Sequence, residues 1–185
     1  IIIPVGIETP QGAHTNILFW NFKNNELERF EPNGKNPPIN FNYNGDLLDT
    51  FLINKFKKFK KDFTYLKPSD YLPNIGFQMI ENLETDKCKR IGDPNGFCTV
   101  WCIWYCYQKM LNLKISSKEL AEELINNIKL EGKSFKNLIR NFSKNISDYR
   151  DEYLLKIGID INYWISNNFS DQEFNQLEKE ILKLI

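Results

Sequence analysis

The chain of 185 residues has one histidine, only four cysteines and no excess of charge of either sign. Lysine plus arginine and aspartate plus glutamate both number 24, which gives a formal net charge of zero. A domain that binds nucleic acid normally has a clear basic excess, so we expect no nucleic-acid partner. No apolar run approaches the roughly 18 residues of a membrane helix, so we expect no membrane partner. The opening 1–3 is too short for a signal peptide.

The few cysteines also exclude some functions. Cys98, Cys102 and Cys106 recur at intervals of four on one predicted helix, where they are poorly placed to bridge one another. The pattern is unlike a secreted disulfide framework, and we expect a reducing compartment. Together with Cys88, the three could suggest a metal cluster, but zinc sites need convergent pairs of ligands. We therefore expect no metal and no cofactor.

Hydrophobic periodicity predicts an α+β fold in a single domain, residues 1–185, with a helical part over 114–185 after a β-rich part over 1–113. Strands are expected over 15–22, 26–30, 63–66 and 75–79. Helices are expected over 47–61, from Asn95 to about 113, and over 116–130, 134–157 and 170 to near the end. The segments 1–11 and 81–92 are expected to be irregular.

Local signals fix several of these helix starts. Asp46 is expected to cap the first helix. Two Ser-x-x-Glu capping boxes begin at Ser116 and Ser170. The run 55–61 alternates lysine with phenylalanine and could contact an acidic partner, although it is typical of a solvated helix face whose phenylalanines lie in the core.

The stretch from Asp93 to Tyr107 is a Pro/Asn/Gly turn followed by an almost wholly apolar run. Such a run predicts an enclosed helix with Asn95 as its N-cap. Cys98 then falls in the first turn, where unpaired N–H groups and the helix dipole lower the pKa of a thiol. A catalytic cysteine is usually presented in this way. The alternative is a small hydrophobic core residue, which is what most cysteines are.

The same apolar run contains three large aromatic side chains. Trp101, Trp104 and Tyr105 are expected in the core. The alternative is that one of them lines the wall of a substrate cleft.

His14 is the only imidazole, and a lone histidine is more often structural than catalytic. A hairpin turn centred near Lys23 places His14 opposite position 31 or 32, so His14 and Glu31 should be cross-strand neighbours on one face. A carboxylate at that range can hold one ring nitrogen and leave the other as a base. With Cys98 these residues form a nucleophile, base and orienter. We expect glutamates 26 and 28 on the same strand to tolerate replacement by glutamine.

Four short motifs resemble those of a known family: His14-x-Asn16, Arg29-Phe30-Glu31-Pro32-x-Gly34, Gly76-x-Gln78 and Gly96-x-Cys98. Their order resembles that in the clan of adenain, the adenovirus proteinase, and the ubiquitin-like-protein proteases, which look like papain with a permuted chain. The Phe-Glu-Pro-x-Gly string closely matches the one that carries the triad acid of adenain. The pattern looks most like predicted members of this clan in large DNA viruses, and the resemblance covers about residues 14–113.

Three features depart from the pattern of that clan. Thr15 stands where the ubiquitin-like-protein proteases have tryptophan, and Phe97 and Thr99 flank the cysteine in place of aspartate and glycine. The clan has its oxyanion-hole glutamine a few residues before the cysteine, where this chain has Asp93, which cannot donate when ionised. Gln78 is the best remaining candidate, and the alternative is an ordinary amide at the end of a strand.

The resemblance implies a cysteine peptidase of the permuted papain-like fold, with His14 as base, Glu31 as orienter, Cys98 as nucleophile and Gln78 in the oxyanion hole. It implies cleavage after Gly-Gly-like sequences in a ubiquitin-like protein tail or a virion precursor, and the sequence leaves both substrates open. The compartment would be cytoplasmic or virion-associated. The alternative function is a catalytically inert partner-binding or structural virion protein with the same fold.

Overall fold

The computed structural model describes residues 1–39, 41–84, 96–167 and 169–183 of the chain. They form two compact units, residues 1–140 and 141–185. The first unit contains the sheet and every candidate site residue, and the second is helical. The prediction of a single domain stays a prediction.

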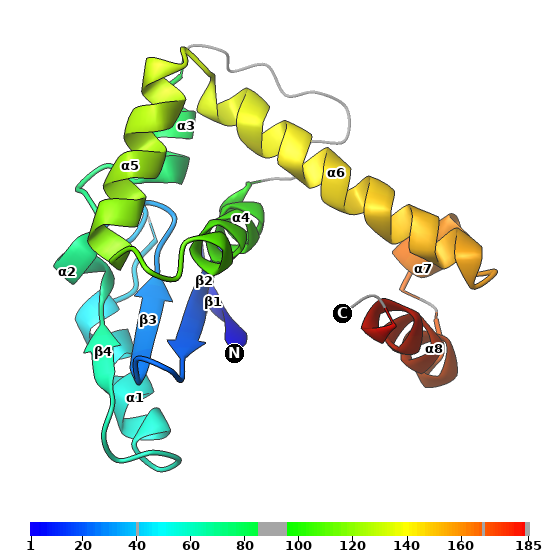
Figure 1. The fold of residues 1–185 in the computed structure, drawn as a ribbon, viewed down its shortest axis with the longest axis horizontal. Helices are drawn as coiled ribbons and strands as arrows, with labels where there is room; N and C mark the ends of the chain where they lie inside the picture. The colour runs from blue at the N-terminus through cyan, green and yellow to red at the C-terminus, as the bar shows by residue number, and fades with distance from the viewer. Residues whose placement is uncertain (40, 85–95, 168, 184–185) are drawn as a thin grey trace. The chain divides into compact units, whose positions relative to one another are not determined.

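The sheet of the first unit has four strands in the order β1-β2-β3-β4 (Figure 1). These are β1 (Ile2–Thr9), β2 (Gly12–Asn21), β3 (Glu26–Phe30) and β4 (Thr64–Leu66). The first three are antiparallel neighbours, and β4 runs parallel to β3. The strands predicted over 15–22, 26–30 and 63–66 are confirmed. The expectation of an irregular segment over 1–11 is wrong, because its backbone pairs with β2 along eight residues.

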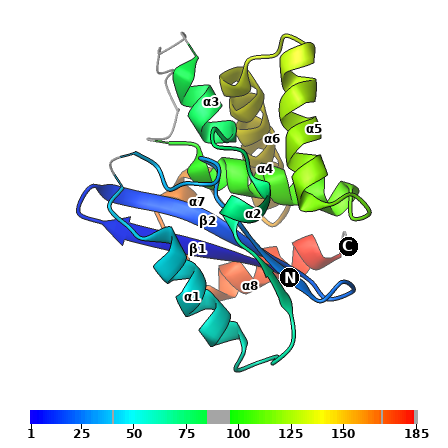
Figure 2. The same ribbon diagram turned by 90° about the vertical axis from the view of Figure 1, so that its left-hand side faces the viewer.

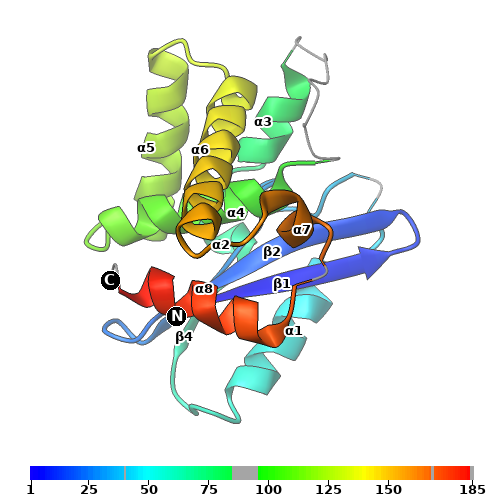
Figure 3. The same cartoon turned by 90° about the vertical axis from the view of Figure 1, so that its right-hand side faces the viewer.

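Strand β2 is buried on both faces, as its continuous apolar run predicts. Leu18 and Trp20 face helix α1 (Gly45–Phe56) and pack with Leu52 of that helix. Figures 2 and 3 show α1 on one side of the strands and helix α4 (Cys98–Leu111) on the other. The strand therefore holds the centre of the core, and the site residues at its start are fixed by packing on both sides.

Helix α1 begins and ends earlier than predicted. Asn44, not Asp46, caps it by accepting a hydrogen bond from the backbone N–H of Leu47. The helix stops at Phe56, so the Lys/Phe run lies mostly beyond its end. Phe56 packs edge-on against Trp20, but Phe59 is 74% exposed. The prediction that the phenylalanines of this run are core residues is therefore wrong for Phe59.

Helix α4 crosses the opposite face of the sheet and carries the expected aromatic core. Trp101, Trp104 and Tyr105 are all buried, and the Tyr105 ring stacks on Phe30 at 4.0 Å. The helix is not enclosed on every side, because a stripe of its side chains is exposed: Ile103, Tyr107 and Met110. The predicted N-cap, Asn95, lies outside the described residues, and the residue that precedes the helix is Phe97.

Two short helices replace part of the predicted β structure. Helix α2 (Pro68–Tyr71) begins with proline, which is favoured at a first helical position. Helix α3 (Phe77–Leu83) occupies the segment in which a strand over 75–79 is predicted, so that prediction is wrong. Short apolar runs do not distinguish strand from buried helix, and here residue 77 is buried as the first residue of a helix. Residues 85–92 of the predicted charged loop lie outside the described residues.

The helical part of the chain agrees closely with the sequence patterns. Both capping boxes form, at the starts of α5 (Ser117–Leu130) and α8 (Asp171–Leu182). The long helix α6 (Phe135–Lys156) lies where 134–157 is predicted, and α7 (Ile161–Ile165) is an additional short helix. In the second unit, Leu154, Ile159 and Leu177 form a small core.

The α+β class is therefore confirmed in its coarse form, a four-stranded sheet with eight helices among the described residues. Within that part of the chain, no helix is both long and apolar enough to cross a membrane.

Candidate functional site

His14 and Glu31 meet where β3 ends. The Nε2 atom of His14 lies 2.8 Å and 3.0 Å from the two carboxylate oxygens of Glu31. The hairpin pairs Ile17 with Phe30, so its register differs by one or two positions from the predicted pairing of 14 with 31 or 32. The face of the hairpin is the predicted one, because positions 14 and 31 still lie on the same side of the pleat in this register. The predicted contact is confirmed, and its register is corrected.

Glu31 is only 1% exposed, and its carboxylate accepts hydrogen bonds from five groups, one of them the side-chain amide of Asn33 at 3.3 Å. Besides His14, the others are the amide of Asn16 at 2.8 Å, the backbone N–H of Asn33 at 3.0 Å and the hydroxyl of Tyr43 at 2.5 Å. Burial raises the pKa of Glu31, but the hydrogen bond and charge of His14 and the other donors lower it below its ordinary value. The carboxylate is therefore ionised and fixed in position.

Sequence reasoning did not identify Tyr43 as part of the site. It lies in the loop before α1, and its ring and that of Phe41 both lie against the imidazole of His14, at centroid distances of 6.4 Å and 5.6 Å. A Pro/Asn/Gly-rich segment gives no signal of where its aromatic residues pack.

A chain of buried polar contacts extends the site toward α1. Asn16 accepts a hydrogen bond from Arg29 at 2.5 Å, and the Arg29 guanidinium pairs with both carboxylate oxygens of Asp49 at 2.6 and 2.8 Å. Tyr65 of β4 donates to the same carboxylate at 2.6 Å. The second and fourth strands and α1 are thereby connected to Glu31, which stiffens the orientation of its carboxylate. Asp49 was also not identified from the sequence.

Cys98 is the first residue of α4, as predicted. The start of this helix is held against β2 by two contacts of Thr15. The hydroxyls of Thr15 and Thr99 lie 2.9 Å apart, and the thiol of Cys102 donates to the carbonyl oxygen of Thr15 at 3.4 Å. Cys98 is half-buried, and the neighbouring His14 imidazole lowers the pKa of its thiol. Glu31 accepts from Nε2, which leaves Nδ1 as the ring nitrogen available to the thiol.

This arrangement shifts both pKa values toward an ion pair. Burial raises the pKa of Cys98, but the hydrogen bond and charge of His14 lower it to about 7 overall. Burial lowers the pKa of His14, but its hydrogen bonds with Cys98 and Glu31, and their charges, raise it to about 9. Between these values the thiolate and the imidazolium coexist. The site can therefore present a nucleophilic sulfur at neutral pH.

Gln78 lies near the other predicted site residues, but on a helix. It is in the first turn of α3, so the alternative of a strand-end amide is wrong. Its Oε1 accepts from the amide of Asn33 at 3.3 Å, and its Nε2 lies 3.7 Å from the position that a Cβ on Gly96 would take. The structure thus brings His14, Glu31, Gln78 and Cys98 into one region, while their roles stay predictions.

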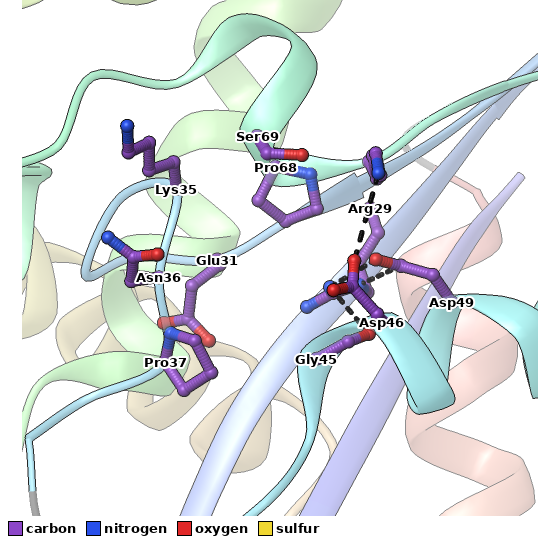
Figure 4. A pocket seen from close by; sticks show the side chains of 11 residues that line it. Arg29, Glu31, Lys35, Asn36, Pro37, Gly45, Asp46, Asp49, Pro68 and Ser69 are labelled. Atoms are coloured by element: carbon purple, nitrogen blue, oxygen red, sulfur yellow. Dashed lines mark hydrogen bonds and ion pairs between the residues drawn. The ribbon is translucent and has the colours of Figure 1, made fainter.

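A polar recess of about 260 Å³ is lined in part by Glu31 (Figure 4). Glu31 and the ion pair of Arg29 and Asp49 line opposite sides of it, and Lys35 and Lys67 are among the other lining residues. Three acidic side chains, Glu31, Asp46 and Asp49, line it together with three basic ones, Arg29, Lys35 and Lys67, so the formal charges around this recess balance.

The three described cysteines do not form a metal cluster, and no group of three or more histidine, cysteine or acidic side chains is arranged for a metal within the described ranges. Cys88 lies outside them.

Comparison with known proteins gives one informative match. A curated protein of Acanthamoeba polyphaga mimivirus, named as a putative ankyrin repeat protein, is 44% identical to this chain over 192 aligned residues. The match covers the whole chain but a quarter of the length of that relative. No family model matches the chain, and no solved structure matches it.

These findings correct the family, the function and the enzyme class predicted from the sequence. The relative is named for ankyrin repeats, and no peptidase family matches. Membership of the adenain and ubiquitin-like-protein protease clan, thiol-protease activity and cleavage after Gly-Gly-like sequences are therefore wrong predictions. The predicted viral resemblance agrees with the viral relative. The physical reason for the error is that a few motif residues define a local site, and a site alone does not establish turnover.

Proposed function

We propose that this chain is a partner-binding module whose permuted papain-like fold serves recognition and not turnover. The match of the whole chain to a protein named for ankyrin repeats supports this, because ankyrin arrays are surfaces for binding other proteins. The described residues form a sheet flanked by helices, unlike the stacked pairs of helices of an ankyrin array, so the chain would contribute a binding surface of a different kind. We expect it to act in a reducing compartment, the cytoplasm or the virion.

The observation that carries this proposal is a preformed apolar recess of about 370 Å³. Its apolar wall consists of Ile39, Met79 and Leu83, together with two prolines of the segment before residue 39. Ile39 is 77% exposed and Leu83 is 65% exposed, so the described residues leave two large apolar side chains largely uncovered at its edge. Exposed apolar groups around a concave surface are typical of interaction sites.

The walls of this recess are rigid because two loops are joined through their backbones. The N–H of Gly76 donates to the carbonyl oxygen of Asn33, and the N–H of Lys35 donates to that of Pro73. Gly34 has a φ of +116°, and a Cβ there would lie 2.5 Å from the Pro73 carbonyl oxygen. Only glycine allows this approach. A preorganised recess loses little entropy when a partner binds.

The lining of the recess identifies the chemistry of its occupant. None of the described residues around it is charged, and four of them are asparagines at positions 33, 36, 74 and 82. Asparagine amides offer both donors and acceptors, which matches a peptide backbone and not an anion. The occupant is therefore a polypeptide segment that inserts one apolar side chain and keeps its backbone against the amides.

The neighbouring polar recess extends this surface. The two recesses share Asn36 and Pro37, so a segment that fills the apolar recess can continue toward Lys35 and Lys67.

The test is a selection of displayed random peptides on the immobilised chain, followed by calorimetry. Selected peptides should share an apolar anchor. They should bind about tenfold or more weakly to Ile39→Asp and Leu83→Asp, because burying such an anchor contributes roughly 1.5–3 kcal/mol. Leu130→Asp is the matched control, since Leu130 is 84% exposed and outside the recess.

Failure to enrich any peptide, or equal binding to all three variants, would contradict the proposal. Mass spectrometry of the peptide after incubation gives a second criterion. Cleavage by the wild-type chain, lost in Cys98→Ala, would show turnover and overturn a binding-only function.

A further inference from the structure

The pair of Cys98 and His14 has no role in the apolar recess, although the orientation of both side chains is closely fixed. Both contacts of Thr15 hold the start of α4 to β2, so the helix cannot move the thiol away from the imidazole without breaking them. The imidazole is 3% exposed and is bonded to Glu31 at one nitrogen. The rings of Phe41 and Tyr43 restrict its rotation.

The three described thiols differ strongly in environment. Cys98 is half-buried, whereas Cys102 is 0% and Cys106 is 2% exposed. Burial raises the pKa of Cys106 to about 12 and that of Cys102 well above its ordinary value. Only Cys98, among these three, combines access for a small reagent with a positively charged neighbour. Reactive cysteines occur in such environments, and buried ones are inert.

We propose that Cys98 is a modification site, at which a hydroperoxide oxidises the sulfur once per molecule. The thiolate attacks one oxygen of hydrogen peroxide, an S–O bond forms and the O–O bond breaks. The sulfur is oxidised by two electrons to a sulfenic acid and the peroxide is reduced. The leaving hydroxide takes the proton of the His14 imidazolium and departs as water.

The surroundings of Cys98 also determine the fate of the oxidised sulfur. Cys102 lies one turn further along α4, is fully buried and donates to Thr15, so it is not available to form a disulfide with the sulfenic acid. A small external thiol would condense with the sulfenic acid, forming a mixed disulfide and water. A second equivalent of that thiol restores Cys98 by exchange and leaves as its own disulfide. The modification is thereby reversible.

The experiment treats the full chain with hydrogen peroxide in the presence of dimedone and reads the adduct at each cysteine by mass spectrometry. Cys98 should be labelled about tenfold or more faster than Cys106. The rate at Cys98 should rise with pH through about 7. Cys98→Ala should remove this label, while Cys106→Ala, the matched control, should keep it.

His14→Gln tests the role of the imidazole, since it removes the charge and keeps a polar side chain. We expect the rate at Cys98 at pH 7 to fall about tenfold, and its pH dependence to move toward the ordinary thiol value of about 8.5. Circular dichroism and the protection of Cys102 establish that this variant is folded. If the variant is unfolded, the proposal is tested by the pH dependence of the labelling rate in the wild-type chain. Equal labelling of Cys98 and Cys106, or a wild-type midpoint at or above 8.5, would overturn the proposal.

Discussion

Glu28 lies in the middle of β3 and Glu31 directly follows its last residue, and both are 1% exposed, yet their surroundings differ in kind. An odd separation along a strand places them on opposite faces of the sheet. Glu28 faces α4, where the hydroxyls of Tyr105 and Ser117 each donate at 2.6 Å and Lys109 lies 3.3 Å away. These partners connect β3 to two helices and are themselves buried or satisfied within the cluster.

Glu31 faces the other way, and its partner His14 is left with one ring nitrogen toward a half-buried thiol. The first carboxylate therefore belongs to an enclosed structural cluster, while the second holds a group that can react. Burial of a charged residue alone does not distinguish these two cases. The distinction lies in whether the last member of the hydrogen-bonded chain is accessible.

The largest expected effect is on the enclosed cluster. Glu28→Gln leaves the Lys109 ammonium buried without its counter-charge, so we expect a loss of about 3 kcal/mol in the free energy of unfolding, measured by urea denaturation. The burial of Glu28 and its polar contacts were not foreseen from the sequence, which gave no reason to expect a loss of stability here. Glu8→Gln, at an exposed position of β1, is the control and should change stability by less than about 0.5 kcal/mol.

A double variant separates charge from packing in this cluster. Glu28→Gln with Lys109→Met removes both charges, and it should recover a large part of the lost stability. A double variant as unstable as the sum of the two single variants would show that the ion pair is not the cause.

The second effect concerns reactivity. Glu31→Gln removes the charge that supports the imidazolium, so the alkylation rate of Cys98 by iodoacetamide at pH 7 should fall about tenfold. Glu28→Gln, in conditions where it is folded, should leave that rate near wild type. Equal losses in the two variants would erase the proposed difference between the clusters.

The third effect is on packing around the thiols. Cys102→Ala removes a fully buried sulfur and its contact with Thr15, and we expect a loss of about 1–2 kcal/mol. Cys98→Ala should cost less, because Cys98 is only half-buried. Urea denaturation of both variants under reducing conditions measures the difference.

Local sequence rules predict the parts of this site that depend on the alternation of side chains along a strand and on where a helix starts. The register that pairs 14 with 31 has the same parity as the observed one, so a shift of two positions leaves His14 and Glu31 on one face, whereas the alternative pairing with 32 would have separated them. Cys98 starts a helix because turn residues precede an apolar run. These two inferences need no knowledge of the tertiary structure.

The partners of the two glutamates could not be predicted in the same way. Ser117 donates to Glu28 from 89 positions away in the sequence, and Asp49 of α1 pairs with Arg29 from 20 positions away. A buried carboxylate such as that of Glu28 is tolerated only because these distant groups donate to it. The sequence of the strand alone does not show which residues they are. The prediction of a strand at Gln78 was wrong for another reason. Its short apolar run fits a strand and a helix equally well.

The smallest expected effect is on the pH dependence of the free energy of unfolding, which should be nearly flat near neutral pH. The pKa of His14 is raised to about 9, so its stabilising contribution is complete below its ordinary value of about 6.5 and is lost as pH rises through 9. The pKa of Cys98 is lowered to about 7, so its contribution is present above the ordinary thiol value and is lost as pH falls through 7. Between pH 7 and 8.5 the folded pair holds one proton, on His14, and the unfolded pair also holds one, on Cys98.

Because both states bind the same number of protons there, the free energy of unfolding should change by less than about 0.5 kcal/mol across this range. In Cys98→Ala the thiol contribution is absent and the pKa of His14 loses the raising effect of Cys98 while keeping that of Glu31. Stability should then decline as pH rises from about 6.5 to the folded pKa of His14 in the variant, by no more than about 1.4 kcal/mol per unit. Urea denaturation at intervals of half a pH unit measures both curves. A wild-type curve as steep as that of the variant would mean that no proton moves from Cys98 to His14 on folding. The proposed difference between the accessible Glu31 cluster and the enclosed Glu28 cluster would then be contradicted.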